Sequence, residues 1–472
     1  MPDALQEFYE QRPDWSAPSA EDGLERATIS VPRDYGEPGG AQLTIALSRL
    51  RATNPAKRRG VLLSVNGGPG GDNGEGLKLP LEFPAAVREA YDLIGFDPRG
   101  TGESTRLYSE VAVPVAPFDS RPPDSLFEQI ALDMRERELA CARAGGDLRP
   151  HITTRNIARD MDVIRGVLGE DRISFVGYAY GTLVGAVYGS MFPSRLDRSV
   201  LDSCVNPNWT WREQFVTQAE AVYRNVQKWA QWTAERNVHF GLGRSAAAVL
   251  ETVEEVVSSL EEMGAVHLRT LFDGAVGTRA TDRGQWDSLG YLVGDLRKAE
   301  DVATAQKLIA GNGTWRPQDT TGELRIGVLE AITMETEWPT DLDVYFADMR
   351  EHREHYPYGF GVLRAQPWVG AFRTFSNREE PTYVKRVGYP VGLVVQADGD
   401  QFDRYEGGVA MAERLGHHLV VVEDSGDHEV YAFAGNTVLD DIVNAYLVDG
   451  VLPDRRVGVP GSTPRPDIPA DA

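Results

Sequence analysis

Over its first 204 residues, the chain alternates short apolar runs with stretches in which apolar residues recur every three or four positions. Apolar runs at residues 60–65 and 91–96 are each followed by a glycine-rich turn, and segments 24–31 and 41–50 predict an antiparallel pair of strands. Strands that are apolar throughout are typical of a parallel sheet with both faces covered. The alternation of strand and helix therefore predicts an α/β fold.

The alternation stops in the middle of the chain and resumes near its end. The middle predicts helices and holds eight of the nine tryptophans, and an apolar run at 391–396 marks the return of the sheet. We expect an inserted helical cap that presents some of these rings to a substrate, because ligand pockets are largely apolar and aromatic. The expected division is a core of residues 1–204 and 381–451, a cap of 205–380, and a proline-rich, poorly ordered tail of 452–472.

A sharp turn at residues 177–181 follows the apolar run 173–176 and precedes a helical pattern. Its flanks, Gly177 and Gly181, are what a nucleophile elbow requires, because its central residue lies in a strained turn where neighbouring Cβ atoms would collide. The central position holds Ala179, where such an elbow holds serine. Taken alone, a match of this length favours a glycine-rich turn that only joins a strand to a helix.

A second glycine-rich loop, residues 66–71, directly follows the strand predicted at 60–65. Because it has almost no side chains, its backbone can approach a ligand closely. In α/β-hydrolases one oxyanion-hole amide belongs to the residue after the nucleophile, here Tyr180, and another to this loop. We expect Gly70 to supply it, with Gly71 as second choice. A phosphate cradle would need a lysine and a hydroxyl at set spacing, and neither is present.

An acid and a histidine follow the cap, in the order nucleophile, acid, histidine that this fold uses. Asp400 lies in the turn after the strand predicted at 391–396, where active-site loops gather, and is the expected acid. Asp398 is a near competitor and Asp403 a remote one. His428 lies in the loop after the next predicted strand and is the expected base.

The composition limits the classes of binding partner that we expect. The 48 basic and 71 acidic side chains give a formal charge of −23, which repels nucleic acid and anionic membranes. No apolar run approaches a membrane span, and the acidic start of the chain does not resemble a secretion signal. Cys141 and Cys204 lie far apart and form no metal-ligand pattern. We expect a cytoplasmic protein with no metal or organic cofactor, whose oligomeric state the sequence does not predict.

Together these motifs resemble the tripeptidyl aminopeptidase and prolyl iminopeptidase branch of the α/β-hydrolases, a peptidase S33-like family whose elbow usually reads Gly-Tyr-Ser-Tyr-Gly-Thr. Residues 177–182 match it everywhere except at Ala179. The resemblance covers nearly the whole chain outside the tail and implies an α/β-hydrolase fold with a helical cap. It gives Ala179 the nucleophile position, Asp400 the acid position and His428 the general-base position. One departure is residues 401–403, which replace a more usual proline and threonine pattern.

The resemblance implies a serine hydrolase that cleaves an amide bond of a small peptide or peptide-like substrate through an acyl-enzyme. Loss of the triad serine lowers turnover about a million-fold, so the chain as written is expected to be catalytically disabled. An engineered replacement of serine by Ala179 is favoured over natural loss, because the acid, the base and the oxyanion loop are all retained. For an aminopeptidase, cap carboxylates should hold the substrate ammonium. Glu335 and Glu337, beside Trp338, are the candidates, although a solvated acidic turn is an equal interpretation.

Two other functions stay open. One is an ester, lactone or amide hydrolase of a specialised-metabolite pathway, which would share the core but need no ammonium site. The other is a natural non-hydrolytic binding protein, or a lyase-like enzyme that uses His428 without a nucleophile.

Overall fold

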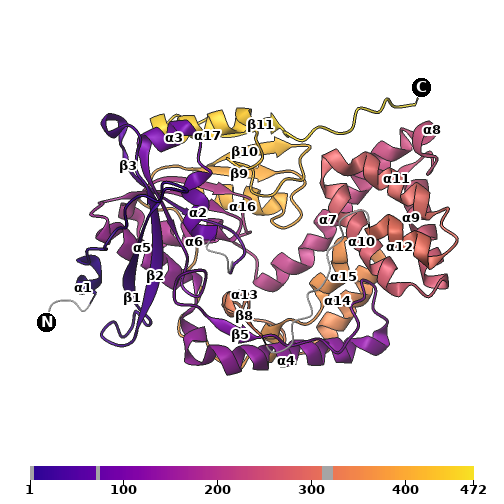
Figure 1. Ribbon diagram of the computed structural model, residues 1–472, viewed down its shortest axis with the longest axis horizontal. Helices are drawn as coiled ribbons and strands as arrows, with labels where there is room; N and C mark the ends of the chain where they lie inside the picture. Colours follow the sequence, from indigo (N-terminus) through magenta and orange to yellow (C-terminus); the bar gives the residue numbers. More distant parts are fainter. Residues whose placement is uncertain (1–4, 71–74, 311–322, 472) are drawn as a thin grey trace.

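The computed structural model describes residues 5–70, 75–310 and 323–471, and a nine-stranded sheet forms its centre (Figure 1). The strand order is β1-β2-β4-β3-β6-β7-β9-β10-β11. β2 is antiparallel to both β1 and β4, and the strands of this sheet from β4 to β11 are parallel. This confirms the predicted antiparallel pair and the predicted parallel sheet. The strands are β1 Glu25–Pro32, β2 Gln42–Leu50, β3 Gly60–Val65, β4 Tyr91–Phe96, β6 Ile173–Tyr178, β7 Leu196–Asp202, β9 Leu393–Ala397, β10 His418–Glu423 and β11 Arg456–Pro460.

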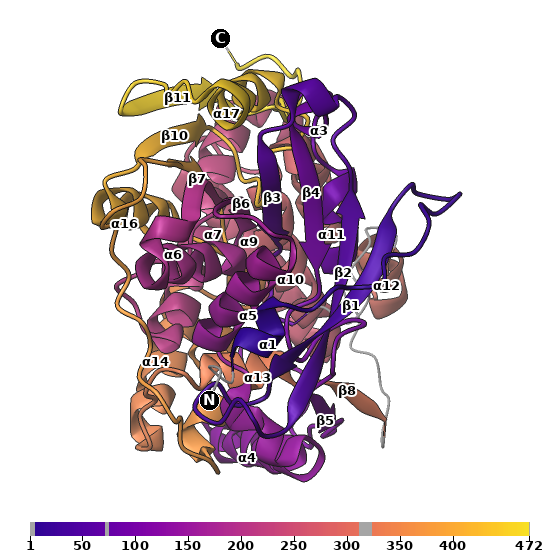
Figure 2. The ribbon, with the colours of Figure 1, turned by 90° about the vertical axis from the view of Figure 1, so that its left-hand side faces the viewer.

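Helices cover both faces of the sheet, as the apolar strands require. In β3, Leu63 packs into the core under α5, α6 and α16, whereas its neighbour Leu62 packs into the core under α3 and α17. This alternation follows from the two-residue period of a strand, and Figure 2 shows the sheet between its helices. The helices of the core are α1 Gln6–Tyr9, α2 Glu75–Lys78, α3 Ala85–Ala90, α5 Thr154–Val167, α6 Tyr180–Met191, α16 Tyr405–Leu415 and α17 Thr437–Asp449.

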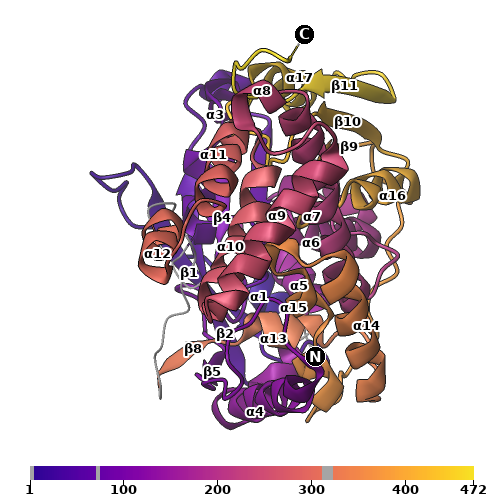
Figure 3. The same ribbon diagram turned by 90° about the vertical axis from the view of Figure 1, so that its right-hand side faces the viewer.

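The helical cap begins after β7 (Figure 3), and it has a hydrophobic core of its own. Its first helix, α7, starts at a capping box in which Thr210 and Glu213 satisfy each other's backbone amides. Trp229, Trp232 and Trp286 are buried inside the cap and therefore hold it together. The cap helices are α7 Trp211–Ala234, α8 Asn237–Phe240, α9 Ala246–Glu262, α10 Val266–Thr281, α11 Trp286–Leu296, α12 Val302–Ala310, α13 Val328–Thr333, α14 Leu342–His355 and α15 Gly361–Ala365.

A segment from the first part of the chain also packs against the cap. Strand β5, Tyr108–Glu110, pairs with β8, Leu324–Ile326, in a separate two-stranded sheet. Helix α4, Phe127–Gly145, contributes Phe127 to a small cluster with residues of α14 and α15. Residues of the first part of the chain, in β5 and α4, therefore also pack against the cap. The loss of strand and helix alternation after residue 204 did not indicate this contact.

The tail is more ordered than its prolines predicted. β11 forms the parallel edge of the main sheet, with Val457 paired to Val420, and the backbone oxygen of Ile468 accepts a bond of 2.6 Å from Arg236 Nε. The expectation of a poorly ordered tail was wrong because a proline is tolerated at the end of an edge strand, where Pro460 lies.

Candidate active site

Ala179 lies in the sharp turn between β6 and α6. Its φ of 48° and ψ of −119° belong to a region that residues with a side chain rarely adopt. Both flanking glycines are required by close backbone packing. A Cβ on Gly177 would lie 2.4 Å from Gly181 O, and one on Gly181 would lie 2.3 Å from Val65 O. The turn thus holds residue 179 at the carboxyl end of the sheet in a strained conformation.

Asp400 and His428 meet beside this turn. Asp400 is 1% exposed, and its Oδ2 lies 2.8 Å from His428 Nδ1. Its other oxygen accepts bonds from the amides of Phe402, at 2.8 Å, and Asp403, at 3.1 Å, which fix the carboxylate. Asp398, the near competitor, instead binds the amide of Ser425 and pairs with a lysine. The structure therefore brings Asp400, not Asp398, to the imidazole.

Three carboxylates surround the imidazole of His428. Burial disfavours the imidazolium, but the charge and hydrogen bond of Asp400, followed by the charges of Asp403 and Glu429, outweigh it and raise the pKa of His428 to about 10. Burial, together with the charge of Asp400, raises the pKa of Asp403 to about 8. Asp403 Oδ2 lies 4.0 Å from His428 Nε2, the nitrogen that Asp400 does not contact. Asp403, the remote competitor for the acid position, therefore lies beside the imidazole nitrogen that would exchange a proton with a reacting group.

A further buried carboxylate anchors the histidine loop. Asp202, at the end of β7, accepts bonds from the amides of Val430, at 3.0 Å, and Tyr431, at 2.6 Å. Burial raises the pKa of Asp202 to about 7. The sequence prediction did not single out this residue, although its position at the carboxyl end of a strand was a signal.

The glycine-rich loop lies against the turn at 179. A Cβ on Gly67 would lie 2.7 Å from Ala179 Cβ, so no larger residue fits there. Gly68 lines the same cavity as Ala179 and His428. A Cβ on Gly70, the expected oxyanion donor, would lie 3.1 Å from Val328 Cβ, so this part of the loop packs against α13. Gly71, the second choice, lies outside the described residues.

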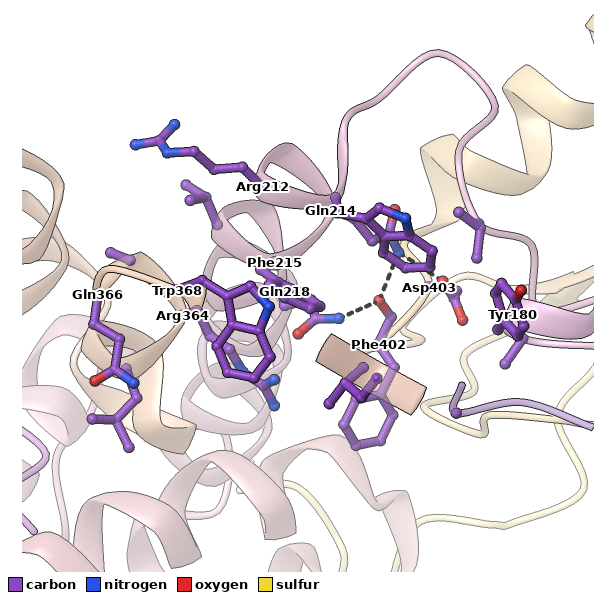
Figure 4. Close-up of a pocket in the computed structure, with 18 of the residues that line it drawn as sticks. Tyr180, Arg212, Gln214, Phe215, Gln218, Arg364, Gln366, Trp368, Phe402 and Asp403 are labelled. Carbon is purple, nitrogen blue, oxygen red and sulfur yellow. Dashed lines mark hydrogen bonds between the residues drawn. The ribbon is translucent and has the colours of Figure 1, made fainter. Parts of the chain in front are cut away.

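A cavity of about 370 Å³ is lined by Ala179 and His428 and by residues of the cap. Figure 4 shows this cavity in close-up. Its walls are mostly aromatic and aliphatic and come from the core turns and from α7, α13, α14 and α15. Trp338, a candidate from the sequence, lines it, and its ring nitrogen donates to Thr333 O at 2.8 Å. The other rings of the cavity belong to Tyr180, Trp211, Phe215, Tyr345, Trp368 and Phe402.

The two expected ammonium ligands do not line this cavity. The Glu337 side chain is 91% exposed and lies 3.2 Å from Arg373, so the solvated-turn interpretation holds for it. Glu335 lines a separate pocket, where Thr154 Oγ1 donates to it at 2.7 Å and the Thr154 amide also binds it. It thereby satisfies a free amide at the first turn of α5, and burial raises the pKa of Glu335 to about 7. Thr154 Oγ1 in turn lies 2.9 Å from the hydroxyl of Tyr180.

Several polar groups of the cavity were not predicted from the sequence. Arg212 and Arg364 reach it from α7 and α15, and Gln214 and Gln218 reach it from α7. Nothing in the local sequence marked them, because only the packing of the cap on the core brings them to the wall of this cavity.

This constellation, an elbow, a buried acid–imidazole pair and a glycine loop at the carboxyl ends of parallel strands, defines the α/β-hydrolase class. Residues 60–289 match the family described as "alpha/beta hydrolase fold", and residues 360–458 match that described as "TAP-like protein". The chain is 31% identical to the tripeptidyl aminopeptidase of Streptomyces lividans, over 96% of this chain and 86% of that protein. The chain thus belongs to the tripeptidyl aminopeptidase family of α/β-hydrolases, which confirms the resemblance drawn from its motifs.

Two more relatives cover most of the chain. The serine protease Hip1 of Mycobacterium tuberculosis is 28% identical over 90% of this chain and 85% of its own length. Carboxylesterase B of the same species is 27% identical over 90% of this chain and 84% of its own length. Among the described helices, none combines the length and apolar character needed to span a membrane.

Proposed function

We propose that this protein, in the form that carries serine at position 179, hydrolyses an amide bond of a small peptide or peptide-like substrate from its amino end. The observation that carries the proposal is the 2.8 Å contact of Asp400 with His428 in the cavity that also holds the strained turn of Ala179. The peptidase names of the tripeptidyl aminopeptidase and Hip1 relatives support the amide over the ester.

In this mechanism His428, oriented by Asp400, removes the proton of the serine hydroxyl at position 179 as its oxygen attacks the substrate carbonyl. The carbonyl oxygen becomes an oxyanion that accepts bonds from the amide of Tyr180 and from an amide of the glycine loop, either that of Gly70 or that of Gly68, which lines the cavity. His428 then donates its proton to the leaving amine as the C–N bond breaks. Water, deprotonated by His428, attacks the ester, and the acid is released with the hydroxyl restored.

We further propose that Ala179 replaces a serine by engineering. A methyl side chain has no use for the strained conformation with a φ of 48°, because it cannot attack a substrate. The turn, its two glycines and the Asp400–His428 pair are nevertheless all retained. A site released from selection for nucleophilic attack would not keep every partner of one missing oxygen. The coding sequence of the source gene tests this directly, since a serine codon supports it and an alanine codon contradicts it.

The test of the function is turnover by Ala179→Ser. We expect hydrolysis of tripeptidyl p-nitroanilides with a free amino end, and losses of about 10⁴-fold or more in kcat for His428→Ala in that background. Asp400→Asn should also lower kcat strongly, because the imidazole then loses its orienting carboxylate. A folded Ala179→Ser protein that cleaves neither arylamides nor esters would contradict the proposal.

A second candidate is ester hydrolysis, which carboxylesterase B favours as a relative. The positions of Glu335 and Glu337 away from the cavity wall also favour it, because an ester substrate needs no ammonium ligand. Turnover of p-nitrophenyl esters without turnover of the matching peptidyl arylamides would establish this alternative over the first.

A further inference from the structure

Arg364 is a cation on the cavity wall with no ion-pair or hydrogen-bond partner among the residues that the structure describes. It lies in the last turn of α15, and Figure 4 places it beside Gln218 and Trp368, away from Tyr180 and Asp403. Burial alone lowers its pKa, and no hydrogen-bonding or charged neighbour in the described part of the chain counters this. A guanidinium nevertheless stays protonated, so the cavity contains a fixed positive charge.

Two other arginines of the protein are paired. Arg99 lies 2.6 Å from Asp160, and both side chains are fully buried. Arg212, the second arginine of the cavity, is bound to Asp348 and lies 5.1 Å from the ring centre of Tyr345. Removing a charge from water is costly unless a partner replaces the water. Arg364 thus differs from these arginines in that the residues described around it provide no such partner.

Two glutamines, Gln214 and Gln218, add polar groups to the cavity wall, and Gln214 also donates to Asp403 at 2.6 Å, at the His428 end. Gln214 and Gln218 both donate their amide nitrogens to Phe402 O, at 3.1 and 2.9 Å, and this leaves both side-chain oxygens buried without a partner among the described residues. These oxygens can accept N–H groups of a bound peptide. Of the described residues that line the cavity, Asp403 is the sole carboxylate, and it lies at the His428 end.

We propose that Arg364 binds a carboxylate of the substrate, so that the site selects an anionic peptide or peptide-like compound. The proposal rests on the proposed hydrolytic function and names its substrate class. A guanidinium offers two parallel N–H donors that match a carboxylate, and a cavity that excludes water strengthens the pair. The carboxylate comes either from an acidic side chain on the acyl part or from the chain end of the leaving part.

Two pairs of probes distinguish these sources in the Ala179→Ser protein. The first pair is Ala-Ala-Glu and Ala-Ala-Gln p-nitroanilide, which differ in the acyl part. The second is tetra-alanine with a free carboxylate and the same peptide with a C-terminal amide, which differ in the leaving part. We expect kcat/KM to favour the acidic member of one pair by about 30-fold or more, as for a desolvated charge pair.

Substitutions of the two cavity arginines test whether Arg364 causes the preference for the acidic probe. Arg364→Gln should abolish the difference within the preferred pair by slowing only the acidic probe, and Arg364→Lys should keep part of it. Arg212→Gln is the matched control, since that arginine already has a partner and its loss should leave the ratio within the pair unchanged. Equal rates within both pairs, or equal losses for both members in Arg364→Gln, would overturn the proposal. The comparison within each pair needs no change at Arg364, so it stays informative even if Arg364→Gln fails to fold.

Binding separates this proposal from the hydrolytic one. Calorimetry on the Ala179 chain should show tighter binding of the acidic tetrapeptide or arylamide, and Arg364→Gln should remove that difference. Selective binding without any turnover by Ala179→Ser would refute the hydrolytic function and keep the carboxylate site. Turnover by Ala179→Ser without a preference for the acidic probes would support the hydrolytic function and refute the carboxylate site.

Discussion

The charge of Asp403 sets the pH range in which His428 can act as a base, and Asp403→Asn in the Ala179→Ser protein tests this. Because the pKa of His428 is raised to about 10, the imidazole is protonated at neutral pH and activity should rise as the pH increases. The asparagine keeps an acceptor for the 2.6 Å bond from Gln214 Nε2, so the loop should stay in place. The substitution therefore removes a charge with little change of shape.

The magnitude follows from the 4.0 Å separation of Asp403 Oδ2 and His428 Nε2. Two unit charges at that distance interact by about 4 kcal/mol near a protein surface. Since the pKa of Asp403 is itself raised to about 8, its carboxyl is largely neutral at pH 7, and only part of this energy applies. We expect the rising limb of kcat/KM to move down by about 1 to 2 pH units, with a higher rate than the parent above about pH 8, where the Asp403 carboxyl is ionised.

The assay is the pH profile of kcat/KM for a peptidyl p-nitroanilide, measured from about pH 5 to about pH 10. Asp398→Asn is the control, since Asp398 pairs with Lys228 and does not contact His428. A profile that does not move, or that moves toward higher pH, refutes the reasoning that Asp403 holds the proton on the imidazole.

Three more predictions concern the elbow and the two acids of the cap. Gly181→Ala should cost about 3 kcal/mol or more of unfolding free energy in urea, because its Cβ would lie 2.3 Å from Val65 O, whereas Gly39→Ala, with no atom within 4 Å, should change it by less than about 0.5 kcal/mol. Burial raises the pKa of Glu335 from 4.5 to about 7, so folding stability should fall as the pH rises through this range, and Glu335→Gln should remove this dependence and add about 2 kcal/mol at about pH 8. Glu337→Gln should leave the KM of a peptide substrate unchanged, and a large rise in KM would restore Glu337 as an ammonium ligand.

The sheet and the turn at 179 could be predicted because each depends on local sequence. The apolar runs of the parallel strands and the glycines at 177 and 181 report constraints from immediate neighbours. The choice of Asp400 agrees with the geometry in part for the same reason, since the turn just beyond β9 lies at the carboxyl end of the sheet, but the sequence did not separate it from Asp398 in the same turn.

The cavity wall could not be predicted in the same way, because it depends on how the cap packs on the core. Glu335 and Glu337 lie two residues apart, yet one is bound at the first turn of α5 and the other is exposed to solvent. Arg364 reaches the cavity only through the placement of the short helix α15. The acidic turn was visible in the sequence, but its orientation was not.

The tryptophans that hold the cap together are not those that face the cavity. Trp229 and Trp286 lie in the interior of the cap, whereas Trp338 and Trp368 line the cavity that also holds residue 179. Folding of this module and recognition by it therefore depend on different side chains. Evolution could change the specificity of such a protein by altering α15 and its surroundings, without having to rebuild the scaffold that carries them.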